Sequence, residues 1–304
     1  MKVLLVYNPF AGHGRAQKIL PEVEAYFQKK EIEFDLRTTD YHEHGIQIVA
    51  ETDLNQYDGV VAAGGDGTLF EVINGYYQNT SKVRIPIGIL PIGTGNAFAR
   101  DMELHNTHWK DAIEIIALQT PRKVDVGKFT THGEIYYFLN ILGLGFVADV
   151  TEIAYKLKVF GNLSYTLGVL QKTIFLSSYP LTITIDGQEY QRDNIFVEIS
   201  NTRWTANFLM APSAEIDDGY LDVTLLGKLG RIKLLQSFPK IFTGEHIHID
   251  EIETFKVKEI KVETGVPKVL TPDGELLGIT PIEVKCLHKA VEVFWRQGKD
   301  FSSI

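Results

Sequence analysis

The chain has 304 residues, an ordinary apolar fraction of 44% and a formal net charge of −9. This length is typical of two domains rather than of one core. The acidic balance argues against nucleic acid as a partner, because affinity for nucleic acid rests mainly on Lys and Arg at phosphates. The single cysteine, Cys286, excludes an intrachain disulfide and fits the reducing cytoplasm.

Neither a signal peptide nor a membrane span is expected. The first apolar stretch, residues 3–7, stops at Asn8 and Pro9, which is too early for the apolar region of a signal peptide. The longest apolar region, residues 136–150, is interrupted by polar and glycine residues and falls short of the ~18 residues that cross a bilayer. We therefore expect a cytoplasmic protein that contacts a membrane only peripherally, at its inner face.

The first part of the chain alternates short apolar segments with segments of helical periodicity. Strands are expected at residues 2–7, 33–38, 57–63 and 85–90, and helices at residues 16–30, 45–52, 69–77 and from residue 97. Short apolar strands separated by helices are typical of a parallel sheet covered on both faces. The pattern predicts an α/β domain over residues 1–122.

Strands dominate after Pro121, Arg122 and Lys123. They are expected at residues 124–129, 135–142, 181–185, 194–200, 221–226, 256–263 and 282–294. This pattern predicts a mostly antiparallel β-sandwich domain over residues 123–294, with helical inserts at residues 150–178 and 230–242. Residues 295–304 are candidates to complete the first domain.

The most specific motif is Gly-Gly-Asp-Gly-Thr at residues 64–68, at a predicted strand-to-helix junction. Glycines there let the backbone approach a phosphate, and the helix N-terminus supplies N–H donors and a positive dipole end. A glycine-rich turn that binds nothing is the alternative, but three glycines so close together exceed what a turn requires. We interpret the segment as a phosphate-binding loop.

Two further loops follow predicted strands. Residues 91–96, Pro-Ile-Gly-Thr-Gly-Asn, precede a helix, and Thr94 and Asn96 are candidates either to bond a phosphate or to cap that helix. Two neighbouring glycine-rich loops at one sheet edge favour the phosphate, because ligands of open α/β sheets bind there. Residues 8–12 are as typical of a plain turn as of a ligand loop.

Other nucleotide motifs are missing or weak. The sequence contains neither the P-loop pattern nor the protein-kinase motifs. Residues 143–148, Gly-Leu-Gly-Phe-Val-Ala, are similar to a dinucleotide-binding fingerprint. They fall in the strand-rich part, without a convincing βαβ unit and ribose-binding acid, so a structural turn is favoured.

Two acidic turns are candidates for metal binding and proton transfer. Residues 215–220 place three carboxylates around a turn of the oxygen-rich kind that Mg²⁺ prefers, although a solvated hairpin turn explains them equally well. In the second turn, Asp273-Gly274-Glu275, a carboxylate beside a substrate hydroxyl would serve as general base in phosphoryl transfer. Its alternative is again a hairpin turn.

Together these motifs resemble the diacylglycerol kinase catalytic domain family, and within it the bacterial lipid kinases and the sphingosine kinases. The resemblance spans nearly the whole chain in the family's order. It is carried by residues 64–71, 8–9, 91–96, 143–146, 217–219 and 273–275. It implies a nucleotide-binding α/β domain like that of NAD kinases and phosphofructokinases, followed by a β-sandwich domain, with ATP in the cleft between them.

The resemblance also implies roles for individual residues. The implied ATP contacts are Asn8, Pro9, Phe10, Ala11, Gly12, Thr39, Gly65, Asp66, Gly67, Thr68, Leu69, Phe70, Glu71, Thr94 and Asn96. A structural Mg²⁺ would be held by the Asp218 carboxylate and by carbonyls near Glu215 and Tyr220. Either Asp273 or Glu275 would accept the proton of the lipid hydroxyl, and Asp66 is a candidate to position a catalytic Mg²⁺.

One position departs from the family's common pattern. Many bacterial relatives carry Asp after the asparagine of the second loop, whereas this chain has Ala97, as in the sphingosine-kinase version.

From the motifs and the resemblance together, we expect an ATP-dependent lipid kinase that phosphorylates the hydroxyl of diacylglycerol or a related lipid. A sphingoid-base kinase, an NAD kinase with a soluble acceptor, and a nucleotide-binding module without turnover are the alternatives.

Residues 153–176 and 230–242 mix basic and apolar side chains in a way that suits the interface of an anionic bilayer. Two ordinary helices packed on the sandwich explain them equally well. We expect reversible peripheral contact with the membrane that holds the lipid substrate. The oligomeric state stays open, with a homodimer among the possibilities.

Overall fold

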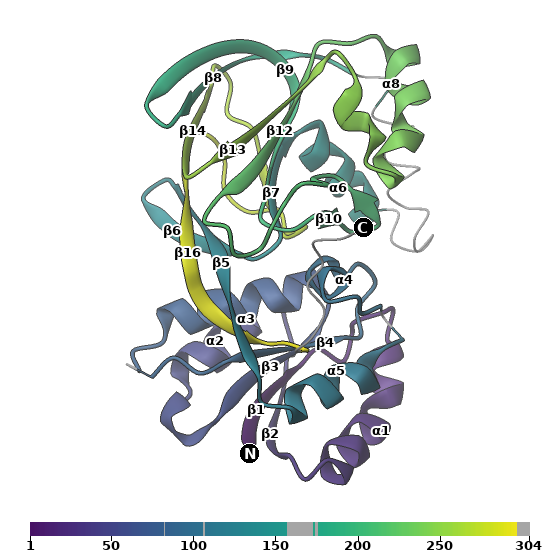
Figure 1. Cartoon of the computed structure of the whole chain (residues 1–304), viewed down its shortest axis with the longest axis vertical. Helices are drawn as coiled ribbons and strands as arrows, with labels where there is room; N and C mark the ends of the chain where they lie inside the picture. The colour runs from purple at the N-terminus through teal and green to yellow at the C-terminus, as the bar shows by residue number, and fades with distance from the viewer. Residues whose placement is uncertain (82, 106, 157–172, 174–175, 297–304) are drawn as a thin grey trace. The chain divides into compact units, whose positions relative to one another are not determined.

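The structure is a computed structural model that describes residues 1–81, 83–105, 107–156, 173 and 176–296. The chain forms two compact units (Figure 1). Unit 1 contains Met1–Val124 and the chain from Lys289 onward, and unit 2 contains Asp125–His288. Both boundaries fall inside strands, in β5 (Pro121–Thr131) and in β16 (Ile282–Phe294).

Unit 1 is built on a parallel sheet. Its strands in spatial order are β4 (Ile87–Pro91), β3 (Gly59–Gly64), β1 (Lys2–Tyr7) and β2 (Glu33–Thr38). Val293 of β16 lies beside Ile87 of β4 in parallel, so the end of β16 extends this sheet, whereas the sequence assigns it to the second domain. Strand β3 is buried along its whole length, which is expected of a parallel strand covered on both faces.

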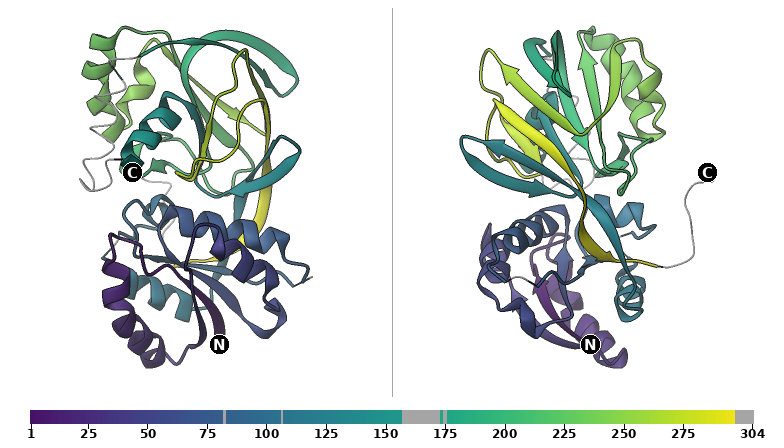
Figure 2. Two further views of the ribbon diagram at one scale, coloured as in Figure 1. Left: turned by 180° about the vertical axis from the view of Figure 1, so that it is seen from behind. Right: turned by 60° about the vertical axis from the view of Figure 1, so that its left-hand side comes forward.

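Helices cover both faces of this sheet (Figures 1 and 2). Helices α1 (Arg15–Lys29) and α5 (Trp109–Ala117) lie on one face, and α2 (His44–Glu51) and α3 (Asp66–Gln78) on the other. The short helices η1 (Leu54–Gln56) and α4 (Ala97–Asp101) complete the unit. Helix α5, which buries Ile113 and Ile116, is not among the elements predicted from the sequence.

Unit 2 is mostly antiparallel. Its strands are β5, β6 (Glu134–Phe138), β7 (Ile141–Gly145), β8 (Tyr179–Ile185), β9 (Gln188–Ser200), β10 (Trp204–Thr205), β11 (Phe208–Leu209), β12 (Leu221–Gly227), β13 (Ile252–Val257), β14 (Glu259–Thr264), β15 (Leu270–Pro272) and β16. Strand β9 pairs with β8 through its first half and with β7 and β12 through its second half. One apolar core, which includes Val197, Val223 and Ile260, lies between the layers of the sandwich. The predicted fold class, an α/β domain followed by a β-sandwich, is therefore confirmed.

Two predicted strands are divided. Residues 135–142 form β6 and β7, and residues 256–263 lie in β13 and β14. Among the residues of unit 2 that the structure describes, the helices are α6 (Phe146–Lys156), α8 (Arg231–Ser237), η3 (Phe238–Phe242) and η4 (Glu245–His248). Much of the insert predicted at residues 150–178 lies outside the described residues. The glycines at 143 and 145 belong to β7, whose neighbours are antiparallel, so they do not form a dinucleotide-binding crossover.

A buried carboxyl group in β9 is not predicted from the sequence. Glu198 is 1% exposed, and its Oε1 accepts hydrogen bonds from Thr205 Oγ1 at 2.5 Å and from Ser200 Oγ at 3.4 Å. Burial raises the pKa of this carboxyl to about 7, against the weaker opposing effect of the two hydroxyl donors. The folded chain therefore holds a proton that the unfolded chain releases near pH 4.5.

Because the folded-state pKa is raised, this carboxyl should cost stability progressively as the pH rises from about 4.5 to about 7. Glu198→Gln removes the titration. The free energy of unfolding of the parent should therefore fall by up to about 3 kcal/mol more than that of the variant between pH 5 and pH 8. Urea unfolding at both pH values measures this difference. Glu189→Gln, at an exposed position of the same strand, is the control. An unchanged pH dependence in Glu198→Gln would contradict the assignment.

Candidate active site

The loop after β1 is tied to the first turn of α3. The backbone N–H of Asn8 donates to the carbonyl of Ala63 at 2.9 Å. The side-chain Nδ2 of Asn8 donates to Oγ1 of Thr68 at 3.2 Å, and Thr68 is 4% exposed. Asn8 therefore holds two predicted nucleotide loops at the carboxyl edge of the sheet, where ligands of open α/β sheets bind.

The two glycine-rich loops touch backbone to backbone. A Cβ on Gly93 would lie 2.3 Å from Cα of Gly65, a distance that no side chain tolerates. The N–H groups of Ile92 and Gly93 donate to the carbonyl of Gly64 at 3.1 and 2.8 Å. Glycine is thus required at position 93 by close approach. Gly67, in contrast, lies in the first helical turn of α3.

Asp66 links the same two loops through its side chain. Its Oδ1 accepts a hydrogen bond from the backbone N–H of Ala97 at 2.6 Å, so Asp66 caps α4 from the neighbouring loop. Asn96, predicted either to cap this helix or to bond a phosphate, makes no side-chain cap. It adopts a left-handed conformation with φ 54°, and its Nδ2 donates to the carbonyl of Gly93 at 3.0 Å.

The environment of Asp66 shifts its titration towards neutral pH. Burial raises the pKa of its carboxyl to about 6, although the N–H donors of Ala97 and Asn96 and the charge of Arg100 act in the opposite direction. Burial also lowers the pKa of the Arg100 guanidinium. Because its pKa lies near neutral pH, the protonation state of the Asp66 carboxyl can change when a charged ligand binds at the loops.

Positive charge and N–H donors converge at these loops. Helix α3 begins at Asp66 and runs for 13 residues, so its N-terminal amides and dipole favour an anion. The Arg15 guanidinium donates to the carbonyls of Ile92 at 3.1 Å and of Gly93 at 3.4 Å. Arg15 is not among the site residues predicted from the sequence, because no motif includes it.

The first loop also packs on the second. Gly12 has φ +59°, and a Cβ there would lie 2.7 Å from the carbonyl oxygen of Ile92. Phe10, in the same loop, is 68% exposed, and Thr94 in the second loop is exposed as well. Pro9 and Ala11 occupy the turn between β1 and α1. These residues are therefore available to a ligand at the sheet edge.

Three of the predicted nucleotide contacts point elsewhere. The side chains of Leu69 and Phe70 are 3% exposed and belong to the core. The Glu71 carboxylate accepts hydrogen bonds from the backbone N–H groups of Glu43 at 2.8 Å and of Gly45 at 2.9 Å, at the start of α2. The N–H of Leu69 already donates to the carbonyl of Gly65 at 3.1 Å, so the amides of α3 that remain for a nucleotide are those before residue 69.

A stacked aromatic pair follows β2. Thr39, 4% exposed, continues the pairing of β2 by donating its N–H to the carbonyl of Tyr7 at 2.9 Å. The Tyr41 ring stacks on His44 with centroids 4.4 Å apart and planes 8° apart, and its hydroxyl donates to Gln47 Oε1 at 2.7 Å. Tyr41 is nevertheless 55% exposed. A fixed, exposed ring at the sheet edge suits a planar ligand such as a nucleobase.

In unit 2, the side chain of Asp273 is committed to the backbone. The residue is 4% exposed with φ 47°. Its Oδ1 accepts from the N–H groups of Asn140 at 3.0 Å and of Ile141 at 2.9 Å, and its Oδ2 accepts from Leu139 at 3.2 Å. Asp273 therefore fixes the turn that carries Glu275, whose side chain is only half-buried.

The acidic turn at residues 215–220 is held by hydrogen bonds and an ion pair, both within the turn and to neighbouring strands. The buried Asp125 accepts the N–H of Gly219 at 2.6 Å and lies 3.0 Å from Nδ1 of His288. Asp218 Oδ1 accepts the N–H of Tyr220 at 2.9 Å, while its Oδ2 lies 2.6 Å from Nζ of Lys256. In the part of the chain that the structure describes, no group of three or more His, Cys, Asp or Glu side chains is placed to hold a metal ion.

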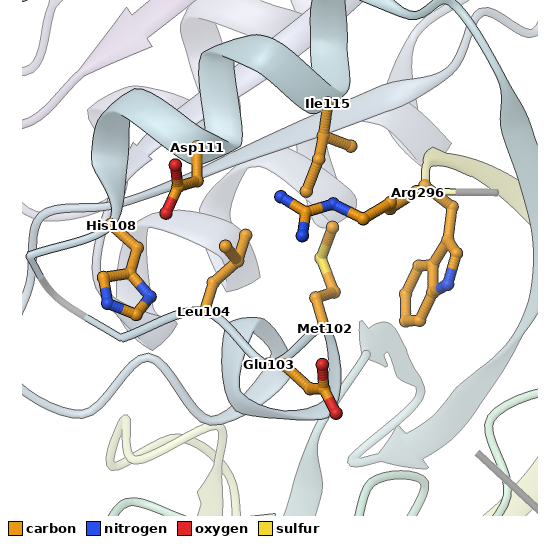
Figure 3. A pocket seen from close by; sticks show the side chains of 8 residues that line it. Met102, Glu103, Leu104, His108, Asp111, Ile115 and Arg296 are labelled. Carbon is orange, nitrogen blue, oxygen red and sulfur yellow. The ribbon is translucent and has the colours of Figure 1, made fainter. Parts of the chain in front are cut away.

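A cavity of about 170 Å³ lies in unit 1 (Figure 3). It is lined by Met102, Glu103, Leu104, His108, Asp111, Ile115, Trp295 and Arg296. In Figure 3 the guanidinium of Arg296 points towards the same space as Met102 and Ile115. None of the residues predicted to bind the nucleotide or to act as base lines this cavity.

Across the described ranges, no helix combines the length and apolar character needed to cross a bilayer.

Comparison with known proteins covers both units. Residues 2–129 match the diacylglycerol kinase catalytic domain, and residues 140–295 match the YegS C-terminal NAD kinase beta sandwich-like domain. A diacylglycerol kinase from Mycobacterium tuberculosis (strain CDC 1551 / Oshkosh) is 29% identical over 297 residues, covering 96% of this chain and 94% of the relative. Sphingosine kinase 1 from Arabidopsis thaliana is 27% identical over 346 residues, covering 95% of this chain and 71% of the relative.

Solved structures agree with these relatives. The crystal structure of a diacylglycerol kinase from Bacillus anthracis str. Sterne superposes with a TM-score of 0.77 at 25% identity, covering 97% of both chains. The motifs, the order of the two units and these similarities lead to one assignment. The chain belongs to the bacterial lipid kinase family, in which a diacylglycerol kinase catalytic domain precedes a YegS-type β-sandwich domain.

Proposed function

We propose that the chain is an ATP-dependent lipid kinase that transfers the γ-phosphoryl group to the hydroxyl of diacylglycerol or a related lipid. The observation that carries this proposal is the contact of Gly93 with Gly65 at the N-terminus of α3. It builds a phosphate cradle in a chain that matches diacylglycerol kinases over more than nine-tenths of its length.

The residues of unit 1 fit a nucleotide. Backbone N–H groups at residues 65–68, together with the Arg15 guanidinium, would bind and orient the phosphates. The Tyr41 ring, which stacks on His44, is the candidate surface on which the nucleobase of ATP would stack. A side chain on Gly93 would fill the space between the loops.

The residues of unit 2 divide the acid–base work. We assign the general base to Glu275 and the positioning of its turn to Asp273, because both carboxylate oxygens of Asp273 accept hydrogen bonds from backbone N–H groups. The lipid hydroxyl oxygen forms a bond to the γ-phosphorus as the bond from that phosphorus to the bridging oxygen breaks. The hydroxyl proton moves to the Glu275 carboxylate, and ADP leaves.

Magnesium is a further part of the proposal. The Asp218 carboxylate and the carbonyls of Glu215 and Tyr220 are oxygen donors of the kind that Mg²⁺ takes. Because Lys256 Nζ lies 2.6 Å from Asp218, a cation would compete with this ammonium group. A structural cation bound there would take the place of this ammonium group and supply rigidity to the turn.

A sphingoid-base kinase is the second candidate, because Ala97 stands where many bacterial relatives have Asp and because a sphingosine kinase is among the similar proteins. In either case the acceptor is held in a membrane, and we propose reversible contact with its inner face.

Transfer of radiolabelled γ-phosphate into a panel of lipids in mixed micelles tests the function. Labelled diacylglycerol supports the first candidate, and labelled sphingoid base supports the second. Label found only in NAD, included as a soluble acceptor, or in no acceptor at all, would overturn the lipid-kinase proposal.

Gly93→Ala should reduce ATP affinity at least about tenfold, because the added Cβ must push the two loops apart. Isothermal calorimetry measures the affinity, and circular dichroism checks the fold. Gly265→Ala is the matched control, since a Cβ at Gly265 has no neighbour within 4 Å. Normal ATP affinity in a folded Gly93→Ala variant would refute the cradle.

Glu275→Gln should lower turnover by roughly two orders of magnitude without changing the melting temperature, as expected for loss of a general base. Asp273→Asn should lower both turnover and melting temperature, because its NH₂ group would face backbone N–H donors. Glu263→Gln, at an exposed carboxylate of β14, controls for the change in charge. If Glu275→Gln keeps near-normal turnover, the base is elsewhere.

Without nucleotide, Mg²⁺ should raise the melting temperature of the parent and fail to raise that of Asp218→Ala, because a ligand of the native state stabilises it by mass action. Lys256→Met should strengthen the effect by removing the competing ammonium group. Asp250→Ala, at an exposed acid, is the control. Equal magnesium shifts in the parent and in Asp218→Ala would place the cation elsewhere.

A further inference from the structure

Helices α8 and η3 carry a charge that is unusual for this chain. Residues 228–242 contain Lys228, Arg231, Lys233 and Lys240 and no Asp or Glu, whereas the whole chain has a net charge of −9. The basic residues are interleaved with apolar ones over this short stretch. Two explanations of this pattern are possible: the segment binds a partner of opposite charge, or it only packs on the sandwich.

The structural explanation accounts for the inner face. Leu234 is 8% exposed and packs in a cluster with Ile195, Phe196, Met210 and Leu226. The Phe238 ring contacts the Phe208 ring with centroids 5.9 Å apart. These contacts fasten α8 and η3 to the sandwich.

Packing explains the outer face only in part. Ile232 is 75% exposed and Leu235 40%. Phe242 is 45% exposed, although its ring contacts those of Phe208 and Phe238 with centroids 5.2 and 5.9 Å apart. Arg231 and Lys240, beside them in sequence, are also exposed. We call Ile232, Leu235 and Phe242, with Arg231 and Lys240, the α8 surface. Large apolar side chains gathered on one exposed segment typically mark an interaction site.

We propose that the α8 surface docks on an anionic lipid bilayer. Ile232, Leu235 and Phe242 enter the boundary between headgroups and acyl chains, and Arg231 and Lys240 contact lipid phosphates. The positive charge of residues 228–242 favours an anionic membrane as the partner. The net charge of −9 would otherwise repel the chain from such a membrane. The inference deepens the proposed function, since it supplies the route by which the enzyme reaches a lipid acceptor.

The structure also narrows the surface expected from the sequence. Among the residues of the second insert, Leu234 is turned into the protein, and Lys233 pairs with Glu251 at 2.6 Å. Ile232 instead is the most exposed apolar residue of the segment. The first insert, residues 153–176, lies mostly outside the described residues, including Lys158 and Lys172, and takes no part in this inference.

Co-sedimentation with vesicles, without nucleotide, tests the surface directly. The parent should bind vesicles of phosphatidylglycerol and phosphatidylcholine more tightly than vesicles of phosphatidylcholine alone, and the difference should shrink with salt. Ile232→Asp and the double variant Arg231→Glu with Lys240→Glu should each weaken binding to anionic vesicles at least about tenfold. These positions are exposed, so the fold should survive, as circular dichroism would verify.

Matched controls come from exposed positions outside the α8 surface. Val266 is 70% exposed, so Val266→Asp repeats the apolar-to-acidic change, and Lys123→Glu repeats the charge reversal. Both should bind like the parent. Unchanged binding of the α8 variants, equal loss in the controls, or equal binding of the parent to neutral vesicles would each overturn the α8 surface as an anionic-membrane site.

Kinase assays separate the α8 surface from the proposed function. The α8 variants should lose turnover on lipid presented in vesicles but retain it on lipid dissolved in detergent micelles, which present no extended bilayer. If the parent phosphorylates no lipid in either form while the binding results hold, the proposed function fails and the surface stands. If the variants lose micelle turnover as much as vesicle turnover, the surface acts on catalysis rather than on docking, and the inference fails.

Discussion

The proposed phosphate site of this protein depends on a backbone contact between two glycines. Gly93 approaches Gly65 so closely that no Cβ fits between them, and the carbonyl of Gly64 accepts N–H groups from both Ile92 and Gly93. This contact brings two loops that are 25 to 30 residues apart in sequence to the same helix N-terminus. Because the amides are fixed before a nucleotide arrives, little reorganisation is needed to bind its phosphates.

In both units, carboxylates that the sequence predicts to take part in the site mainly hold backbone in place. Asp66 caps α4, Glu71 caps α2, and Asp273 binds three successive N–H groups at residues 139–141. Each accepts hydrogen bonds from amides that would otherwise be unsatisfied at a helix start or a turn. The alanine at position 97 is compatible with this arrangement, because Asp66 accepts a hydrogen bond from the backbone N–H of residue 97 and not from its side chain. The departure from the common family pattern therefore leaves the junction of the two loops intact.

The sequence predicts the fold class well because both of its signals are local. Buried parallel strands are continuous apolar runs such as residues 59–63, and the turns of the sandwich carry Asp-Gly pairs. The site is predicted less completely, because its geometry is set by contacts distant in sequence. Nothing in the local pattern indicates that Leu69 and Phe70 face the core, that Arg15 reaches the second loop, or that Tyr41 stacks on His44. Glu198 likewise occupies a strand whose pattern does not reveal a buried acid.

The distribution of charge and exposed apolar surface connects the two halves of the function. A phosphate site needs positive potential in a small region, and Arg15 and the amides of α3 supply it without a basic domain. The net charge of −9 disfavours non-specific adhesion of the chain to anionic membranes. Segment 228–242 differs from this average, since it contains four basic and no acidic residues and exposes Ile232, Leu235 and Phe242. A cationic, apolar surface confined to one segment of an acidic chain would orient the protein on a bilayer as well as attract it, because the attraction acts at that segment.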